Sequence, residues 1–166
     1  MTTPSDDDDA RRVRALLRGT YDAVAERYQQ EIGGELAGKP FDRELLAAFA
    51  REVRGPLCDL GCGTGHVTRF LKDHGATDVV GVDLSPGMLA VARREHPDIR
   101  FEERDMTALD AVPDGAWAGV VAFYSLIHVP RADLVATLRG IRRCLAPGGP
   151  LLVAFHIGED TLRLDT

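Results

Sequence analysis

The pattern of apolar and polar residues changes character at Gly55. Before it, apolar side chains recur at helical spacing, which predicts one or two helices up to Gly33 and Gly34 and a further helix over residues 41–54. After it, short apolar runs alternate with amphipathic stretches. The chain is therefore predicted to have a helical lead-in followed by alternating strands and helices.

The part after Gly55 predicts a layered sheet. Five apolar runs are expected to be strands, at residues 56–60, 78–83, 99–105, 117–124 and 150–157. Helical spacing recurs between them, at residues 65–74, 86–95 and 131–145, and the glycines at 148 and 149 indicate a turn. Strands that alternate with helices pair in parallel through right-handed crossovers. The predicted fold is α/β, a doubly wound and mainly parallel sheet with N-terminal helices.

Length and apolar content indicate one domain. The chain has 166 residues, of which 45% are hydrophobic, enough for a single core. We expect residues 1–9 to be disordered or frayed, residues 10–157 to form the domain, and residues 158–166 to be a short tail. Three cysteines without a C-x-x-C pair suggest neither a disulfide framework nor a metal site.

Charge and hydropathy exclude several classes of partner. The net charge of -6 gives no reason to expect nucleic acid or an anionic membrane. The arginines of "RRVRALLR" follow "DDDD", as in a solvated helix with acids at its start. Because the chain has neither a membrane-length apolar run nor a signal-peptide pattern, we predict a cytoplasmic protein.

The stretch "LCDLGCGTGHVTRFL" joins the first predicted strand to a helix. Glycines at 61, 63 and 65 let the backbone turn sharply and bring a ligand close to the helix N-terminus. Asp83 ends the second strand near the spacing at which an acid reaches ribose hydroxyls. Asp105 closes the third strand, where it could accept a hydrogen bond from an exocyclic amine. Together with Asp59 at the end of the first strand, Asp83 and Asp105 place three acids at successive strand tips, which indicates a nucleoside site.

Asp59, directly before the glycines, favours one nucleoside over another. An acid at this loop would repel a pyrophosphate, and the run G-C-G-T-G-H departs from the dinucleotide pattern G-x-G-x-x-G. A cationic ligand without phosphate suits the site better. S-adenosylmethionine has a sulfonium and an amino group, and it is the cofactor that we predict.

The motifs "CDLGCGTGHVTRFL", "VVGVDLSPGMLAVAR", "FEERDM", "VVAFYSLIHVP" and "LRGIRRCLAPGGPLLVAF" resemble, in order and spacing, those of class I S-adenosylmethionine-dependent methyltransferases. The lead-in "TYDAVAERY" is similar to that of the small-molecule branch. The resemblance implies that Asp59, Gly61 and Gly63 hold the methionine part of the cofactor and Asp83 the ribose. Its other implied contacts are Leu84, Met88, Asp105 and Met106 at adenine, Phe123 and Tyr124 beside methionine, and Tyr28 over the methionine carboxylate.

Two elements of the predicted site have alternative interpretations. Tyr21 and Tyr28, seven residues apart, are either packing residues or part of a lid. His128, in the loop after the fourth strand, is either a general base for the methyl acceptor or a structural residue before Pro130. His156 is a second candidate base.

The chain departs from the family pattern after the fifth strand. Family members continue with a helix and an antiparallel strand pair, whereas only "GEDTLRLDT" follows here. We therefore expect a truncated chain, or a partner chain or homo-oligomer that covers the edge of strand five. The predicted activity is methyl transfer to an O, N or C atom of a small molecule. The alternatives are an idle S-adenosylmethionine-binding fragment or regulatory subunit and, last, an NAD-dependent oxidoreductase.

Overall fold

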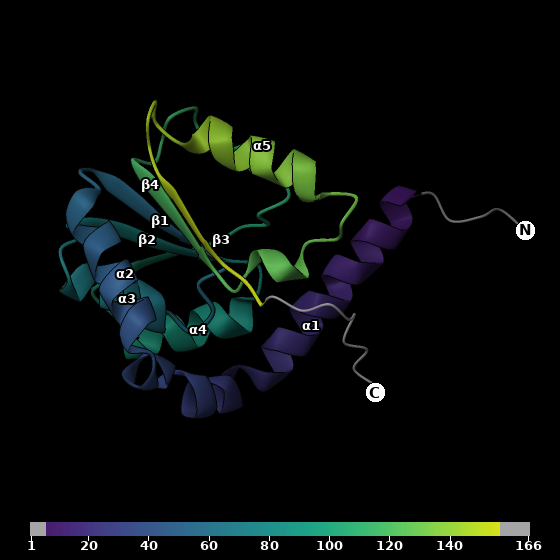
Figure 1. Ribbon diagram of the computed structural model, residues 1–166. Coiled ribbons are helices and arrows are strands. Elements are labelled where there is room, and N and C mark those ends of the chain that lie inside the picture. Colours follow the sequence, from purple (N-terminus) through teal and green to yellow (C-terminus); the bar gives the residue numbers. More distant parts are fainter. Residues whose placement is uncertain (1–5, 157–166) are drawn as a thin grey trace, which may run out of the picture.

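The computed structural model describes residues 6–156, with side chains from Arg11 onward, and it contains one five-stranded sheet (Figure 1). The strands are β1 (Pro56–Leu60), β2 (Asp78–Asp83), β3 (Arg100–Glu103), β4 (Gly119–Phe123) and β5 (Leu151–Ala154). All pair in parallel, in the order β3-β2-β1-β4-β5. The chain reverses its direction of winding between β3 and β4, and the switch point lies between β1 and β4. The predicted doubly wound fold is confirmed.

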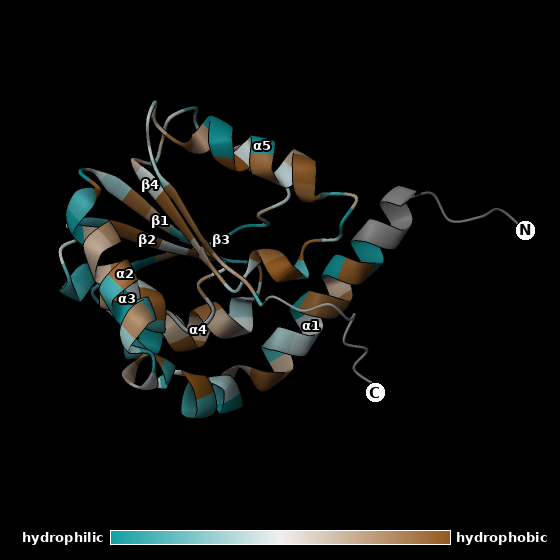
Figure 2. Cartoon of the chain, viewed as in Figure 1, coloured by the Kyte–Doolittle hydropathy of each residue, from teal (hydrophilic) through white to brown (hydrophobic). Residues whose placement is uncertain are grey.

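Helices cover both faces of the sheet (Figure 1). The helices are α1 (Asp6–Ile32), α2 (Pro40–Glu52), α3 (His66–Asp73), α4 (Pro86–Glu95) and α5 (Leu134–Cys144), with 3-10 turns η1 (Glu35–Gly38) and η2 (Leu126–His128). Apolar residues of α2, α3 and α4 pack on one face together with Leu57 and Val121. Residues of α5 pack on the other face together with Cys58 and Val120. Adjacent strand residues thus point to opposite layers, and Figure 2 shows the apolar strands between helices with polar outer faces.

Helix α1 stands apart from the two covering layers. It packs against α4 and runs beside the ends of the strands rather than over a face of the sheet (Figure 1). The segment for which one or two helices were predicted thus forms a single helix. It begins at Asp6, inside the part expected to be frayed, while residues 1–5 and the predicted tail, 158–166, lie outside the described residues.

The structure shortens three of the predicted strands. β3 ends at Glu103, so Asp105 lies in the following loop rather than at the strand tip. Tyr124 has a φ of 53°, a left-handed conformation that ends β4 one residue before the prediction. β5 stops at Ala154, and α5 begins only at Leu134 because residues 131–133 form a turn.

Among the described residues no helix is both long and apolar enough to span a bilayer.

Strand β5 is at one edge of the sheet. It pairs with β4 on one side and has no second strand beside it within residues 6–156.

Candidate functional site

The glycine loop after β1 has the conformation that the sequence predicts. Gly61, Gly63 and Gly65 have φ values of 80°, 54° and 85°, all in the region that favours glycine. A side chain at Gly61 would lie 2.3 Å from the Cβ of Ser125. The loop therefore folds tightly between the tips of β1 and β4, and its backbone forms one wall of the space above them.

The amide groups of this loop are already used within the protein. The N–H of Gly61 donates to the carbonyl of Val82 over 2.7 Å, and that of Gly63 donates to Oδ2 of Asp83 over 2.8 Å. A phosphate cradle needs such N–H groups to point at the ligand. Because these two are satisfied internally, the loop does not present them to a pyrophosphate.

Asp83 links the glycine loop to the start of α4. Its Oδ2 accepts from Gly63 and its Oδ1 accepts from the N–H of Ser85, also over 2.8 Å. Burial raises the pKa of this carboxyl, although the bonds from the backbone amides oppose that shift. The carboxylate is thereby held in one orientation at the pocket wall, as a group that reads a sugar hydroxyl requires.

Asp105 divides its two oxygens between two partners. Oδ1 accepts from the N–H and the hydroxyl of Thr107 over 2.8 and 2.6 Å. Oδ2 lies 3.4 Å from Nε of Arg14, an ion-pair distance rather than a close hydrogen bond. One oxygen thus fixes the loop while the other keeps the capacity to accept from a ligand amine.

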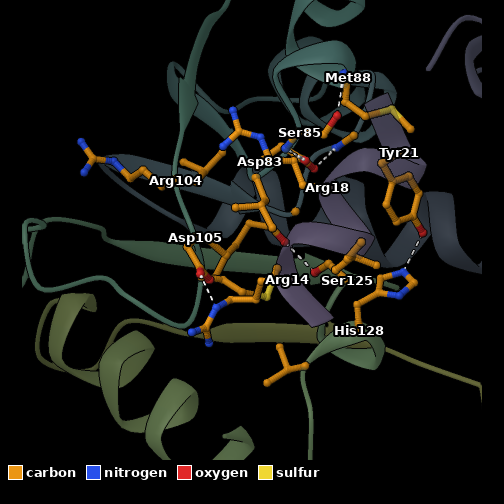
Figure 3. Close-up of a pocket in the computed structure, with 18 of the residues that line it drawn as sticks. Arg14, Arg18, Tyr21, Asp83, Ser85, Met88, Arg104, Asp105, Ser125 and His128 are labelled. Carbon is orange, nitrogen blue, oxygen red and sulfur yellow. Dashed lines mark hydrogen bonds and ion pairs between the residues drawn. The ribbon is translucent and has the colours of Figure 1, made fainter. Parts of the chain in front are cut away.

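A pocket lies where these groups meet (Figure 3), and α1 forms the side opposite the strand tips. It encloses about 840 Å³ of space between side chains, open solvent at the mouth included. The structure brings eleven of the predicted site residues to its lining: Tyr28, Gly61, Gly63, Asp83, Leu84, Met88, Asp105, Met106, Phe123, Tyr124 and His128.

Asp59 is the one predicted cofactor contact that is not among the residues lining the pocket. Its side chain is buried and accepts a 2.6 Å hydrogen bond from the hydroxyl of Thr68 in α3. Burial raises the pKa of Asp59 to about 6. Asp59 thus ties the first turn of α3 to the end of β1, and its predicted contact with the methionine part stays a prediction.

The buried carboxyl of Asp59 gives a pH-dependent contribution to stability. Its folded pKa, about 6, exceeds the ordinary value of 3.8, so its contribution is full below pH 4 and is lost as the pH rises through 6. Asp59→Asn, which can still accept from Thr68, is expected to remove this loss of about 3 kcal/mol. Urea unfolding at pH 4 and pH 7 measures it, with Asp78→Asn at the exposed start of β2 as the control. Equal pH dependence in Asp59→Asn and the wild type would contradict the expectation.

Helix α1 contributes pocket residues that were predicted to be solvated. Arg14 and Arg18 both line the pocket, and Nη2 of Arg18 lies 2.9 Å from Oε1 of Glu103. Arg18 is nevertheless exposed, as the interpretation of "RRVRALLR" as a solvated helix predicts, whereas Arg14 is partly buried. The four-residue spacing of Arg14 and Arg18 indicates that they share one helical face. The spacing does not show that this face lies opposite Asp105 and Glu103.

Each arginine of the pocket has a carboxylate partner. The three pairs lie within 3.4 Å and are Arg14 with Asp105, Arg18 with Glu103, and Arg104 with Glu102. Their charges are thus balanced by the chain itself. The pocket does not require an anionic ligand, and this agrees with the internal use of the loop amides.

Helix α1 is fixed to α4 by a shared carboxylate. Oδ1 of Asp22 accepts from the hydroxyl of Ser85 over 2.6 Å and from the N–H of Gly87 over 2.8 Å. Ser85, the N-cap of α4, in turn accepts from the N–H of Met88. Asp22 therefore accepts a hydrogen bond from a free N–H group in the first turn of α4, and it fixes the position of α1 relative to α4 and the pocket.

The end of the pocket near β4 is aromatic. Phe123 and Tyr124 pack edge to face with ring centroids 4.8 Å apart, and Tyr124 stacks on His156 at 4.6 Å. His128 at the end of η2 lies in the pocket, while His156 is not among the lining residues. Burial lowers the pKa of His128, which keeps its imidazole neutral and able to accept a proton near pH 7.

The sequence of this chain is similar to those of known methyltransferases. The family described as "Methyltransferase domain" matches residues 57–149, more than half of the chain. The malonyl-[acyl-carrier protein] O-methyltransferase of Halorhodospira halophila is 33% identical over 153 residues, covering 90% of this chain and 50% of that protein. The demethylmenaquinone methyltransferase of Beutenbergia cavernae is 35% identical over 142 residues, covering 83% and 57%. The chain thus spans about half the length of these relatives.

Solved structures give the same result. A structure described as a DhpI–SAH complex superposes with a TM-score of 0.69 at 30% identity, covering 82% of this chain and 66% of that chain. A DhpI–SAM–HEP complex has a TM-score of 0.67, also at 30% identity, covering 89% and 65%. The fold, the glycine loop and these similarities together show that the chain belongs to the class I S-adenosylmethionine-dependent methyltransferases.

Proposed function

We propose that the pocket binds S-adenosylmethionine and that the protein transfers its methyl group to an O, N or C atom of a small molecule. The observation that carries the proposal is the pair of carboxylates, Asp83 and Asp105, in a pocket whose loop amides and arginines are internally satisfied. A nucleoside with a cationic centre and no phosphate matches these groups. A pyrophosphate does not.

The pocket residues divide into a nucleoside end and a methyl end under this proposal. Asp83 would bind the ribose hydroxyls and Asp105 would accept from the adenine amine. Leu84 and Met88 would pack on the adenine ring, and Met106 would supply a backbone donor. Met88 is almost fully buried against Ala25 and forms the floor of this end of the pocket. The remaining predicted contacts would surround the methionine part: Gly61, Gly63, Phe123, Tyr124 and Tyr28.

The chemistry places few demands on the protein. When bound, S-adenosylmethionine supplies a methyl group whose bond to sulfur breaks with the electron pair passing to sulfur, so its leaving thioether needs no acid. Alignment of the acceptor can then contribute about 7–11 kcal/mol of barrier lowering. A base is needed for an acceptor that must lose a proton, and His128 is the neutral imidazole available at the methyl end.

The methyl acceptor that we propose is a small molecule. The relatives include an O-methyltransferase and an N-demethylindolmycin N-methyltransferase of Streptomyces griseus, 34% identical over 65% of this chain, so the acceptor atom varies among them. We infer a small-molecule acceptor, and we keep a partner chain or second copy beside β5 as part of the proposal because β5 is an edge strand in the described residues.

Calorimetric titration with S-adenosylmethionine, S-adenosylhomocysteine and NAD tests cofactor choice. Both sulfur nucleosides are expected to bind, NAD is not, and Asp83→Asn is expected to weaken both. Binding of NAD alone would support the oxidoreductase alternative and overturn the proposal. Methyl transfer to a panel of small acceptors, compared between this chain and one extended beyond Thr166, separates an active enzyme from an idle cofactor-binding fragment.

A further inference from the structure

A hydrogen bond joins α1 to the proposed base across the mouth of the pocket. Oη of Tyr21 lies 2.8 Å from Nε2 of His128, and Figure 3 shows the two side chains pointing at each other. Their rings also pack edge to face, with centroids 5.3 Å apart at 77°. Both residues line the pocket, so a ligand at its methyl end would meet the pair rather than the histidine alone.

The bond affects which atom can take a proton from an acceptor. A phenol donates readily, and a neutral imidazole has one nitrogen that accepts. If the phenol donates to Nε2, the lone pair of that nitrogen is occupied. The free lone pair of the Tyr21 oxygen is then the accepting site that faces the pocket.

The surroundings keep both groups neutral. Burial raises the pKa of the Tyr21 phenol, with the nearby carboxylate of Asp83 adding to the effect, and burial lowers the pKa of His128. Tyr28, the other titratable group of α1 packed against Tyr21, has its ring centroid 6.2 Å away, and burial raises its phenol pKa as well. The pair therefore begins the reaction as phenol and imidazole rather than as phenolate and imidazolium.

We propose that Tyr21 is a catalytic residue that relays the acceptor's proton to His128. The inference rests on the proposed methyl transfer and on His128 as its base. The acceptor's proton passes to Oη of Tyr21 while the phenol's own proton passes to Nε2 of His128. Tyr21 ends with one proton, as it began, and His128 ends as an imidazolium. The electron pair left on the acceptor atom forms the new bond to the methyl carbon.

The relay also assigns a role to α1. Tyr21 is placed by its own helix, and the neighbouring Asp22 binds that helix to Ser85 and Gly87 at the start of α4. The phenol can reach His128 only when α1 is docked in this way. The docked position of α1 therefore completes the proton-accepting group, in addition to screening the ligand from water.

The tautomer of His128 tests the relay without an acceptor. Long-range proton–nitrogen spectra of ¹⁵N-labelled protein distinguish a protonated from an unprotonated ring nitrogen, and His128→Gln assigns the signals. In the wild type we expect the proton on Nδ1 and an unprotonated, hydrogen-bonded Nε2. Tyr21→Phe, which keeps both ring contacts, is expected to shift the Nε2 signal, and Tyr28→Phe is expected to leave it in place. A wild-type His128 with the proton on Nε2, or no response to Tyr21→Phe, would overturn the relay.

Turnover gives the second readout, once an acceptor is found with the panel. Tyr21→Phe is expected to lower kcat about 100-fold while the calorimetric dissociation constant for S-adenosylmethionine stays unchanged. Full turnover in Tyr21→Phe with loss in His128→Gln would remove the relay and leave the proposed function intact. Absence of cofactor binding in the wild type would instead remove the proposed function itself.

Discussion

Replacing Gly61 with alanine is expected to lower the free energy of unfolding by about 2–5 kcal/mol and to abolish cofactor binding. Two costs combine at this position. The φ of 80° is unfavourable for any residue with a side chain, and the added Cβ would lie 2.3 Å from that of Ser125. Ser125 is buried, and its hydroxyl donates to the carbonyl of Leu60 over 2.6 Å, so it cannot move aside without losing that bond.

Gly34→Ala is the matched control for this substitution. A Cβ at Gly34 would meet nothing within 4 Å, and the residue precedes η1 and is not among the pocket residues. Urea unfolding of both variants and calorimetric titration with S-adenosylhomocysteine measure the two expected losses. If Gly61→Ala unfolded and bound the ligand like Gly34→Ala, the glycine loop could not be the tightly packed wall described above.

The fold was predictable because its pattern is local. Buried parallel strands are near-continuous apolar runs in the sequence. Segments with helical spacing between such runs predict right-handed crossovers whose helices cover both faces of the sheet. The ends of the strands were less predictable because they depend on tertiary contacts. Tyr124 leaves β4 early through its left-handed backbone conformation, and the third strand stops at Glu103 although "IRFEERD" continues the pattern.

The site was predictable to the extent that it follows from strand order. Residues at the carboxyl ends of neighbouring parallel strands must meet, which is why Asp83 and Phe123 were placed correctly in the pocket lining. Asp59 also stands at the end of a strand, but its side chain points into the layer below, toward Thr68. Near a tight turn, the sequence pattern does not show whether a side chain at a strand end points into the pocket, as that of Asp83 does, or toward a covering helix, as that of Asp59 does.

The contribution of α1 could not be read from local pattern. Arg14 and Tyr21 belong to a helix that packs against α4, and nothing in the spacing of α1 specifies which end of the sheet it will cross. The seven-residue spacing of Tyr21 and Tyr28 therefore predicts either packing residues or a lid. In the structure Tyr21 and Tyr28 pack together and against α4, and both line the pocket; a role as a lid stays a prediction.

His128→Gln is expected to lower kcat by about 10²–10⁴-fold with cofactor binding retained. Glutamine keeps a polar group that can bond to Tyr21 but cannot take a proton at neutral pH. In the wild type, kcat/KM is expected to rise with pH and to level off once His128 is neutral. Because burial lowers its pKa, the midpoint should fall below the ordinary value of 6.5.

The same variant decides between the catalytic and the structural interpretation of His128. A histidine that only supports the turn before Pro130 would reduce stability when replaced, and kcat would keep its pH dependence. His74→Gln is the control, because His74 stacks on Phe70 at the end of α3 and is not among the pocket residues. A loss of kcat and of the pH-dependent limb in His128→Gln alone, with unchanged urea unfolding, would assign the proton to this imidazole. Retained turnover would leave alignment of the acceptor as the main contribution of the protein to catalysis.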